Sequence, residues 1–63
     1  MAAIETSTRK IAARLEREGW LSEHGKEHDI FRNPDFPTLR IVLPRHRAVS
    51  PGVARDIAKK AGW

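Results

Sequence analysis

The sequence predicts a two-layer α+β fold, in which two helices cover one face of an antiparallel three-stranded sheet. Three observations support this prediction: an amphipathic stretch over residues 7–18, three short extended segments between residues 20 and 43, and a capped amphipathic stretch from residue 50 onward. The expected order is helix, three strands, helix. At 63 residues the chain has room for one core, so we expect a single domain over residues 1–63.

The first helix is expected over residues 7–18. Thr6 or Ser7 can accept hydrogen bonds from the first free backbone N–H groups of this helix. Ile11 and Leu15 lie four residues apart and form a narrow apolar stripe, which should face the core.

Three segments after Gly19 are expected to be strands, at residues 20–23, 29–32 and 39–43. The third is the clearest, because apolar residues alternate along it. Gly25 lies in a gap short enough for a hairpin turn. Residues 33–37 are expected to form a turn, since their two prolines cannot donate ladder hydrogen bonds. These strands and short turns predict an antiparallel meander.

Pro44 should end the third strand, and Ser50-Pro51 predicts a second helix, because serine caps helices and proline favours their first position. Gly62 favours the end of this helix. Its apolar face is expected to contain Val53, Ala54, Ile57, Ala58 and Ala61.

Charge is unevenly distributed along the chain. Residues 1–37 carry six Lys/Arg and seven Asp/Glu, a net of −1, whereas residues 38–63 carry six Lys/Arg and one acid, a net of +5. This asymmetry favours a polyanionic partner such as RNA or DNA, although a solvated basic face would also produce it. With no cysteine, no membrane-length apolar run and no signal-peptide core, a cytoplasmic location is expected and no membrane contact.

His28 is the residue best suited to chemistry, because imidazole titrates near neutral pH and this one follows a turn glycine. A general base can take the proton of a ribose 2′-hydroxyl, which then attacks its own phosphate without any protein nucleophile. Fixed cations stabilise the charge that develops on the phosphate. The candidate phosphate contacts are Lys26, Arg32, Arg45 and Arg47.

The other two histidines are candidates for assisting roles. His24 is either an assisting acid or an exposed loop residue, and His46 is better placed to hold phosphate than to transfer protons. Three histidines without cysteine match no zinc spacing, so we expect neither metal nor cofactor. If Phe31 faces the helices, alternation places His28 on the open face of the sheet, but the opposite register remains open.

Three motifs occur in a defined order: Glu-Arg-Glu-Gly-Trp at residues 16–20, Gly-x-x-His-x-x-Phe-Arg-Asn-Pro at residues 25–34, and Pro-Gly-x-x-Arg-x-Ile-x-Lys-x-Ala-Gly-Trp at residues 51–63. From about residue 8 to the C-terminus the chain resembles the HicA-type (YcfA-like) toxins. The resemblance implies a double-stranded-RNA-binding-domain-like α-β-β-β-α fold. It also implies a ribonuclease that cleaves messenger RNA to arrest growth and is neutralised by a HicB antitoxin.

The resemblance also implies that His28, three residues before Phe31, is the catalytic residue. Glu27 departs from the pattern, because the family usually has serine there; a carboxylate at this position would favour a protonated imidazole or oppose phosphate. Two alternatives remain. The fold and charge also fit a non-catalytic RNA-binding module, and the change at Glu27 fits an inactive homologue that binds the antitoxin.

Overall fold

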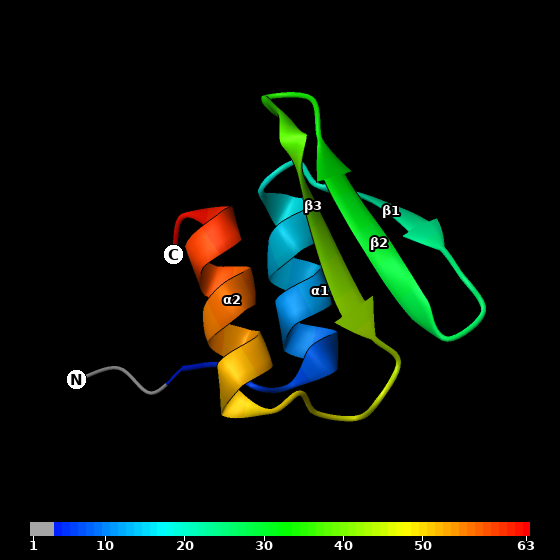
Figure 1. Cartoon of the computed structure of the whole chain (residues 1–63), viewed down its shortest axis with the longest axis vertical. Coiled ribbons are helices and arrows are strands. Elements are labelled where there is room, and N and C mark those ends of the chain that lie inside the picture. Colours follow the sequence, from blue (N-terminus) through cyan, green and yellow to red (C-terminus); the bar gives the residue numbers. More distant parts are fainter. Residues whose placement is uncertain (1–3) are drawn as a thin grey trace.

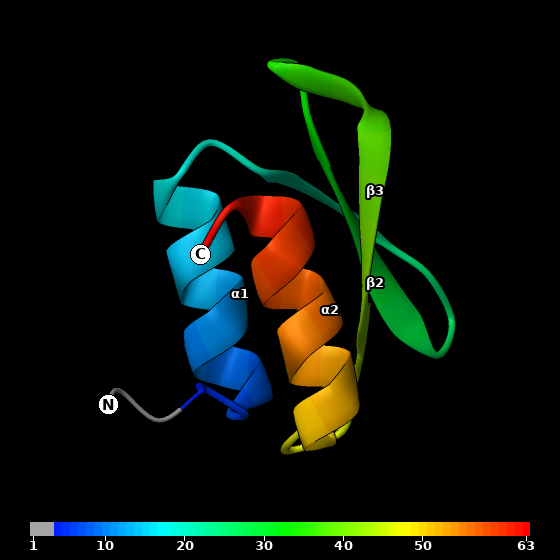
Figure 2. The same ribbon diagram turned by 60° about the vertical axis from the view of Figure 1, so that its left-hand side comes forward.

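The computed structural model describes residues 4–63 and confirms the predicted two-layer α+β fold. Two helices lie on one side of an antiparallel sheet whose strand order is β1-β2-β3 (Figures 1 and 2). The elements in chain order are α1 (Thr8–Arg17), β1 (Leu21–His24), β2 (His28–Asn33), β3 (Phe36–Pro44) and α2 (Pro51–Ala61). This is the α-β-β-β-α arrangement of a double-stranded-RNA-binding-domain-like fold.

The core lies between the sheet and the helices. Both α1 and α2 turn their apolar stripes toward the sheet, and the layers are seen edge-on in Figure 2. The buried apolar side chains are Ile11, Leu15, Trp20, Phe31, Ile41, Leu43, Val49, Ala54 and Ile57. Trp20 and Phe31 are among these core residues, whereas Val53, expected on the apolar face of α2, is 37% exposed and lies outside the core.

Both helices are capped as the sequence predicts. The hydroxyl of Ser7 accepts a hydrogen bond from the backbone N–H of Lys10 over 3.4 Å, and that of Ser50 accepts one from Val53 over 3.3 Å. Gly62 ends α2 at a φ of 81°, a left-handed conformation that glycine adopts without strain.

The third strand begins earlier than predicted. Residues 33–37 were expected to be a turn, but Phe36 already pairs with Asn33 and Pro37 lies within β3. The proline is tolerated there because β3 is an edge strand, on which a missing N–H need not leave a ladder partner unsatisfied. The second strand is also longer than expected and begins at His28 itself.

A buried asparagine closes the β2–β3 hairpin. The Oδ1 of Asn33 accepts a hydrogen bond from the backbone N–H of Asp35 over 2.9 Å, and its Nδ2 donates to the carbonyl oxygen of Glu18 over 3.5 Å. At the same end, Phe36 stacks on Trp20 with ring centroids 6.0 Å apart. The hairpin is thus joined to the end of α1.

Candidate functional site

His28 is the first residue of β2 and lies on the open face of the sheet. Phe31 is 1% exposed and faces the helices, so strand alternation places His28 on the opposite face. The sequence left open which face of the sheet His28 occupies, and the burial of Phe31 decides it. His28 pairs with Pro44, and its own side chain is exposed to solvent.

The turn that precedes His28 requires glycine. The backbone N–H of Gly25 donates to the carbonyl oxygen of His28 over 3.0 Å. A Cβ atom at position 25 would lie only 2.7 Å from that oxygen, which is closer than side chains tolerate. The glycine therefore allows the close approach that holds the backbone of the candidate catalytic residue in place.

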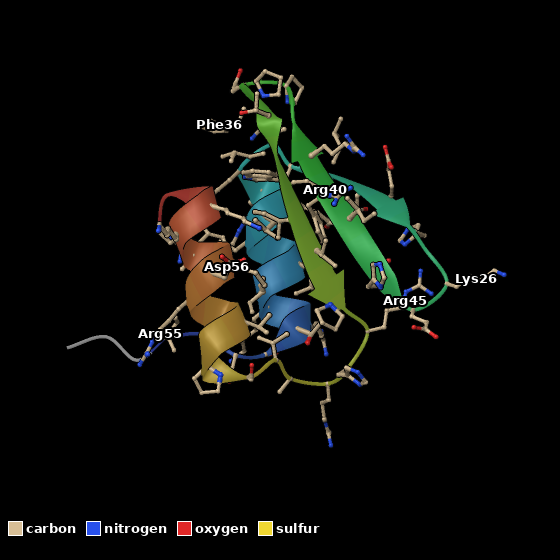
Figure 3. The ribbon with its side chains drawn as sticks, in the orientation of Figure 1. Lys26, Phe36, Arg40, Arg45, Arg55 and Asp56 are labelled. Atoms are coloured by element: carbon tan, nitrogen blue, oxygen red, sulfur yellow. The ribbon has the colours of Figure 1, made fainter. Side chains whose placement is uncertain are left out.

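The basic loop between β3 and α2 lies beside this turn. The backbone N–H of Arg45 donates to the carbonyl oxygen of Glu27 over 3.3 Å, which extends the pairing of the sheet beyond Pro44. Lys26 lies at the tip of the β1–β2 turn, and Arg45 lies next to it at the end of β3 (Figure 3). Two of the predicted phosphate contacts are thus brought to the end of the sheet that carries His28.

Asp29 organises this corner, although the sequence analysis assigned it no role. Its Oδ1 accepts hydrogen bonds from His24 Nδ1 over 2.9 Å and from Arg45 Nε and Nη2 over 3.2 and 3.0 Å. These bonds lower the pKa of the Asp29 carboxyl, the bond from His24 most, while partial burial opposes the shift. Asp29 lies on the same side of β2 as the buried Phe31, next to Leu43, but alternation in the sequence alone did not say which side of β2 meets the helices.

The same contacts define the surroundings of the other histidine of the turn. His24 pairs with Asp29 and lies on the helix-facing side of the sheet, opposite to His28. The structure therefore does not bring the two imidazoles together. Arg45 uses two of its five N–H donors on Asp29, which leaves three for a ligand.

Arg47 and His46 line a groove on the helix side of the molecule, against the first turn of α1. The carbonyl oxygen of Arg47 accepts a hydrogen bond from the backbone N–H of Thr8 over 3.2 Å, and this bond ties the basic loop to α1. The groove is lined by Thr8, Arg9, Ala12, Asp29, Leu43, Arg45, His46 and Arg47. Arg9, which the sequence analysis did not single out, thus joins the predicted cations.

Arg32, the remaining predicted phosphate contact, lies apart from this corner. It is on the same open face as His28 but four residues further along β2, a distance of about 13 Å in a strand. Its Nε lies 3.6 Å from Oε1 of Glu23 on the neighbouring strand. Arg32 therefore belongs to the other end of the open face.

Two further features of residues 4–63 bear on the kind of site. No three His, Cys, Asp or Glu side chains in this part of the chain converge as metal ligands would. Neither helix is long and apolar enough to cross a membrane.

Comparison with known proteins identifies the family. The family model described as HicA toxin of bacterial toxin-antitoxin matches residues 8–63, which include every helix and strand of the fold. The match places the protein in the class of toxins from toxin–antitoxin systems. The chain belongs to the HicA toxin family, as the sequence motifs indicated. Comparisons with curated proteins and with solved structures find no significant match.

Proposed function

We propose that this toxin is a metal-independent endoribonuclease that cleaves messenger RNA, with His28 as its general base or acid. The observation that carries the proposal is the exposed imidazole of His28 on the open sheet face, beside the Lys26 turn and the Arg45 loop. A ribonuclease of this kind arrests growth by removing messages.

The proposed reaction uses the substrate's own nucleophile. His28 takes the proton of a ribose 2′-hydroxyl, and the resulting oxygen attacks the adjacent phosphorus. The bond to the departing ribose 5′-oxygen breaks, that oxygen takes up a proton, and a cyclic phosphate remains on the other product. Lys26, in the turn before His28, stabilises the charge on the phosphate oxygens. Arg45 and Arg47 line the groove on the helix side, so they bind the RNA backbone away from the reacting phosphate.

The departure at Glu27 is compatible with this arrangement. The Glu27 side chain is exposed, and its backbone carbonyl, rather than its carboxylate, accepts the hydrogen bond from Arg45. A serine is therefore not needed to hold the basic loop in place.

The toxin's partner is proposed to be a HicB-type antitoxin that covers the open face. Leu21 is 65% exposed and Val42 is 38% exposed on this face, next to cationic side chains. Exposed aliphatic residues beside cations fit a partner surface that combines apolar and acidic groups. Such a partner would exclude RNA from His28.

The direct test is His28→Ala. We expect the purified variant to lose cleavage of labelled RNA and to lose growth arrest on expression, while its circular dichroism spectrum stays that of the parent. Wild-type cleavage should persist in EDTA, since the mechanism needs no metal ion. Native-rate cleavage by His28→Ala would overturn the assignment.

The glutamate at position 27 supports a second candidate function, that of an inactive homologue that only binds the antitoxin. This candidate predicts co-purification with the antitoxin and no RNA scission by the wild-type chain. Salt-sensitive RNA binding without scission would instead identify a non-catalytic RNA-binding module.

A further inference from the structure

Two arginines face each other directly on the open side of the sheet. Arg32 of β2 and Arg40 of β3 are register partners, so their side chains leave the same face at neighbouring positions. Like charges placed directly opposite in an antiparallel pair destabilise the sheet. This pair therefore works against folding rather than for it.

A third cation reaches the same place from a helix. Lys60 of α2 and the two arginines line one groove, which runs over the free edge of β3. The other lining residues are Pro37, Thr38, Leu39 and Val42. Three cations from β2, β3 and α2 thus converge on one shallow surface.

The neighbouring carboxylates compensate for these charges only in part. Arg32 lies 3.6 Å from Glu23 and Lys60 lies 3.2 Å from Asp56, and both carboxylate side chains are mostly exposed to solvent. Exposed ion pairs of this kind are screened and weak. No carboxylate of residues 4–63 lies within ion-pair distance of Arg40.

The part of the groove formed by Arg32, Arg40 and Val42 lies on the same face of the sheet as His28. Between them lie Ile30 and Val42, a pair of half-exposed aliphatic side chains. The separation along β2 from His28 to Arg32 is about 13 Å, a length that an extended RNA strand spans within a few nucleotides. A strand bound at Arg32 and Arg40 is therefore long enough to reach the candidate catalytic residue.

We propose that Arg32, Arg40 and Lys60 form a second phosphate site, which binds the RNA backbone a few nucleotides from the cleaved bond and sets the path of the strand across the sheet. The inference rests on the proposed ribonuclease function for its ligand. The groove favours RNA over an acidic protein segment because it presents three cations and an open edge along which a backbone can continue.

The test measures binding without cleavage. A fluorescein-labelled single-stranded RNA is titrated in anisotropy experiments at several salt concentrations, with His28→Ala as the parent. Adding Arg32→Gln and Arg40→Gln should weaken RNA binding about tenfold. The slope of the logarithm of the binding constant against the logarithm of the salt concentration should also become shallower, by about 0.7 for each phosphate that is no longer neutralised. Arg55→Gln is the matched control, because Arg55 is an exposed arginine on α2 away from the sheet (Figure 3).

The outcomes separate this inference from the proposed function. If the Arg32→Gln/Arg40→Gln pair binds RNA with the same slope as Arg55→Gln, the second phosphate site is wrong, even where the wild type cleaves RNA. If that pair keeps RNA binding and loses only the antitoxin, the groove is a protein-binding surface and the inference is also wrong. If the wild type cleaves no RNA but its RNA binding depends on Arg32 and Arg40, the second phosphate site is supported and the proposed ribonuclease function is contradicted.

Stability gives an independent readout. Because the arginine pair is repulsive, Arg40→Gln should melt at the same temperature as the parent or slightly higher. A clear fall in the melting temperature would show that Arg40 stabilises the fold, and would remove the reason for assigning it to a ligand.

Discussion

Asp29 connects three segments through one carboxylate. It accepts hydrogen bonds from His24 at the end of β1 and from Arg45 at the start of the basic loop, while its own backbone belongs to β2. The hydrogen bonds to Arg45 hold that guanidinium on the helix-facing side of the sheet, opposite to the side chain of His28. Asp29 therefore ties the basic loop to the sheet behind the proposed catalytic residue.

Replacing Asp29 should make stability less dependent on acid pH. Its pKa is lowered from 3.8 in the folded protein, first by the bond from His24 and then by Arg45, against partial burial. A carboxyl whose folded-state pKa is lowered stabilises the fold fully above the unfolded value and loses that contribution as the pH falls through the folded value. Wild type should thus be more stable than Asp29→Asn at pH 7, and the difference should shrink below about pH 4.

Urea unfolding of the wild type and of Asp29→Asn between acid and neutral pH measures this difference in stability. A difference that stayed constant down to the lowest pH would contradict the role of the charged carboxylate. Asp35→Asn is a suitable control, because Asp35 lies exposed in the β2–β3 turn.

Some residue roles follow from the sequence and others do not. Phe31 is the largest residue of its predicted strand, and its burial agrees with that size. The choice between Asp29 and His28 for the open face depended on which face of β2 meets the helices, and a single strand's alternation cannot decide that. The role of Asp29 was missed because its partners are not its neighbours in the sequence. His24 lies five residues from it along the chain, and Arg45 lies sixteen residues from it.

At the level of elements, the last residue links the two helices. The indole Nε1–H of Trp63 donates to Oε1 of Glu18 over 2.7 Å, and the guanidinium of Arg14 lies 4.1 Å from the centroid of a Trp63 ring. Arg14 also pairs with Glu18 over 3.0 Å. The chain after α2 is thereby attached to the last turn of α1 and to its end.

Trp63→Phe should weaken this link but not abolish it. The phenyl ring keeps an aromatic face for Arg14 and lacks the indole N–H, so we expect the free energy of unfolding to fall by about 1 kcal/mol. The pKa of the Glu18 carboxyl, which the Trp63 bond lowers most, should rise toward 4.5 in the variant. Urea unfolding and NMR titration of Glu18 measure the two effects, and an unchanged Glu18 titration would show that the bond is absent in solution.

Element boundaries were predicted less well than element types. All five elements occur in the expected order, because caps and alternation are local signals. The start of β3 was wrong because Pro37 was interpreted as part of a turn. Whether a proline is tolerated in a strand depends on whether that strand is at the edge of the sheet, and the pairing of strands is a tertiary property.

At the scale of the whole molecule, stability depends on a small core. Nine apolar side chains of residues 4–63 are buried, and Ile41 in β3 is fully buried among them. A domain of this size is expected to be stable by only about 3–9 kcal/mol. Each buried side chain therefore contributes a large fraction of the total free energy of unfolding.

Ile41→Ala should remove much of that stability. Truncation of a buried isoleucine costs about 2–5 kcal/mol, because apolar burial is reduced and a cavity remains. We expect a strong fall in the melting temperature followed by circular dichroism. Val42→Ala, on the opposite face and 38% exposed, is the matched control and should change the melting temperature little.

The positive charge of residues 38–63 is divided among three places in the folded molecule. Arg40 and Lys60 line the groove over β3, and Arg45 and Arg47 line the groove against α1. Arg55 and Lys59 are exposed on α2, with Arg55 away from the sheet. The sequence showed the excess of charge but not its distribution.

The sequence by itself determined the order and type of the elements, the caps of both helices, the membership of the HicA toxin family and the choice of His28 as the candidate catalytic residue. These depend on local spacing and on motifs that can be seen along one chain. Only the tertiary structure decided the face on which His28 lies, the hydrogen bonds of Asp29 with His24 and Arg45, and the meeting of Arg32, Arg40 and Lys60. Those depend on strand register and on the packing of α2 beside β3, which bring together residues that are distant in sequence.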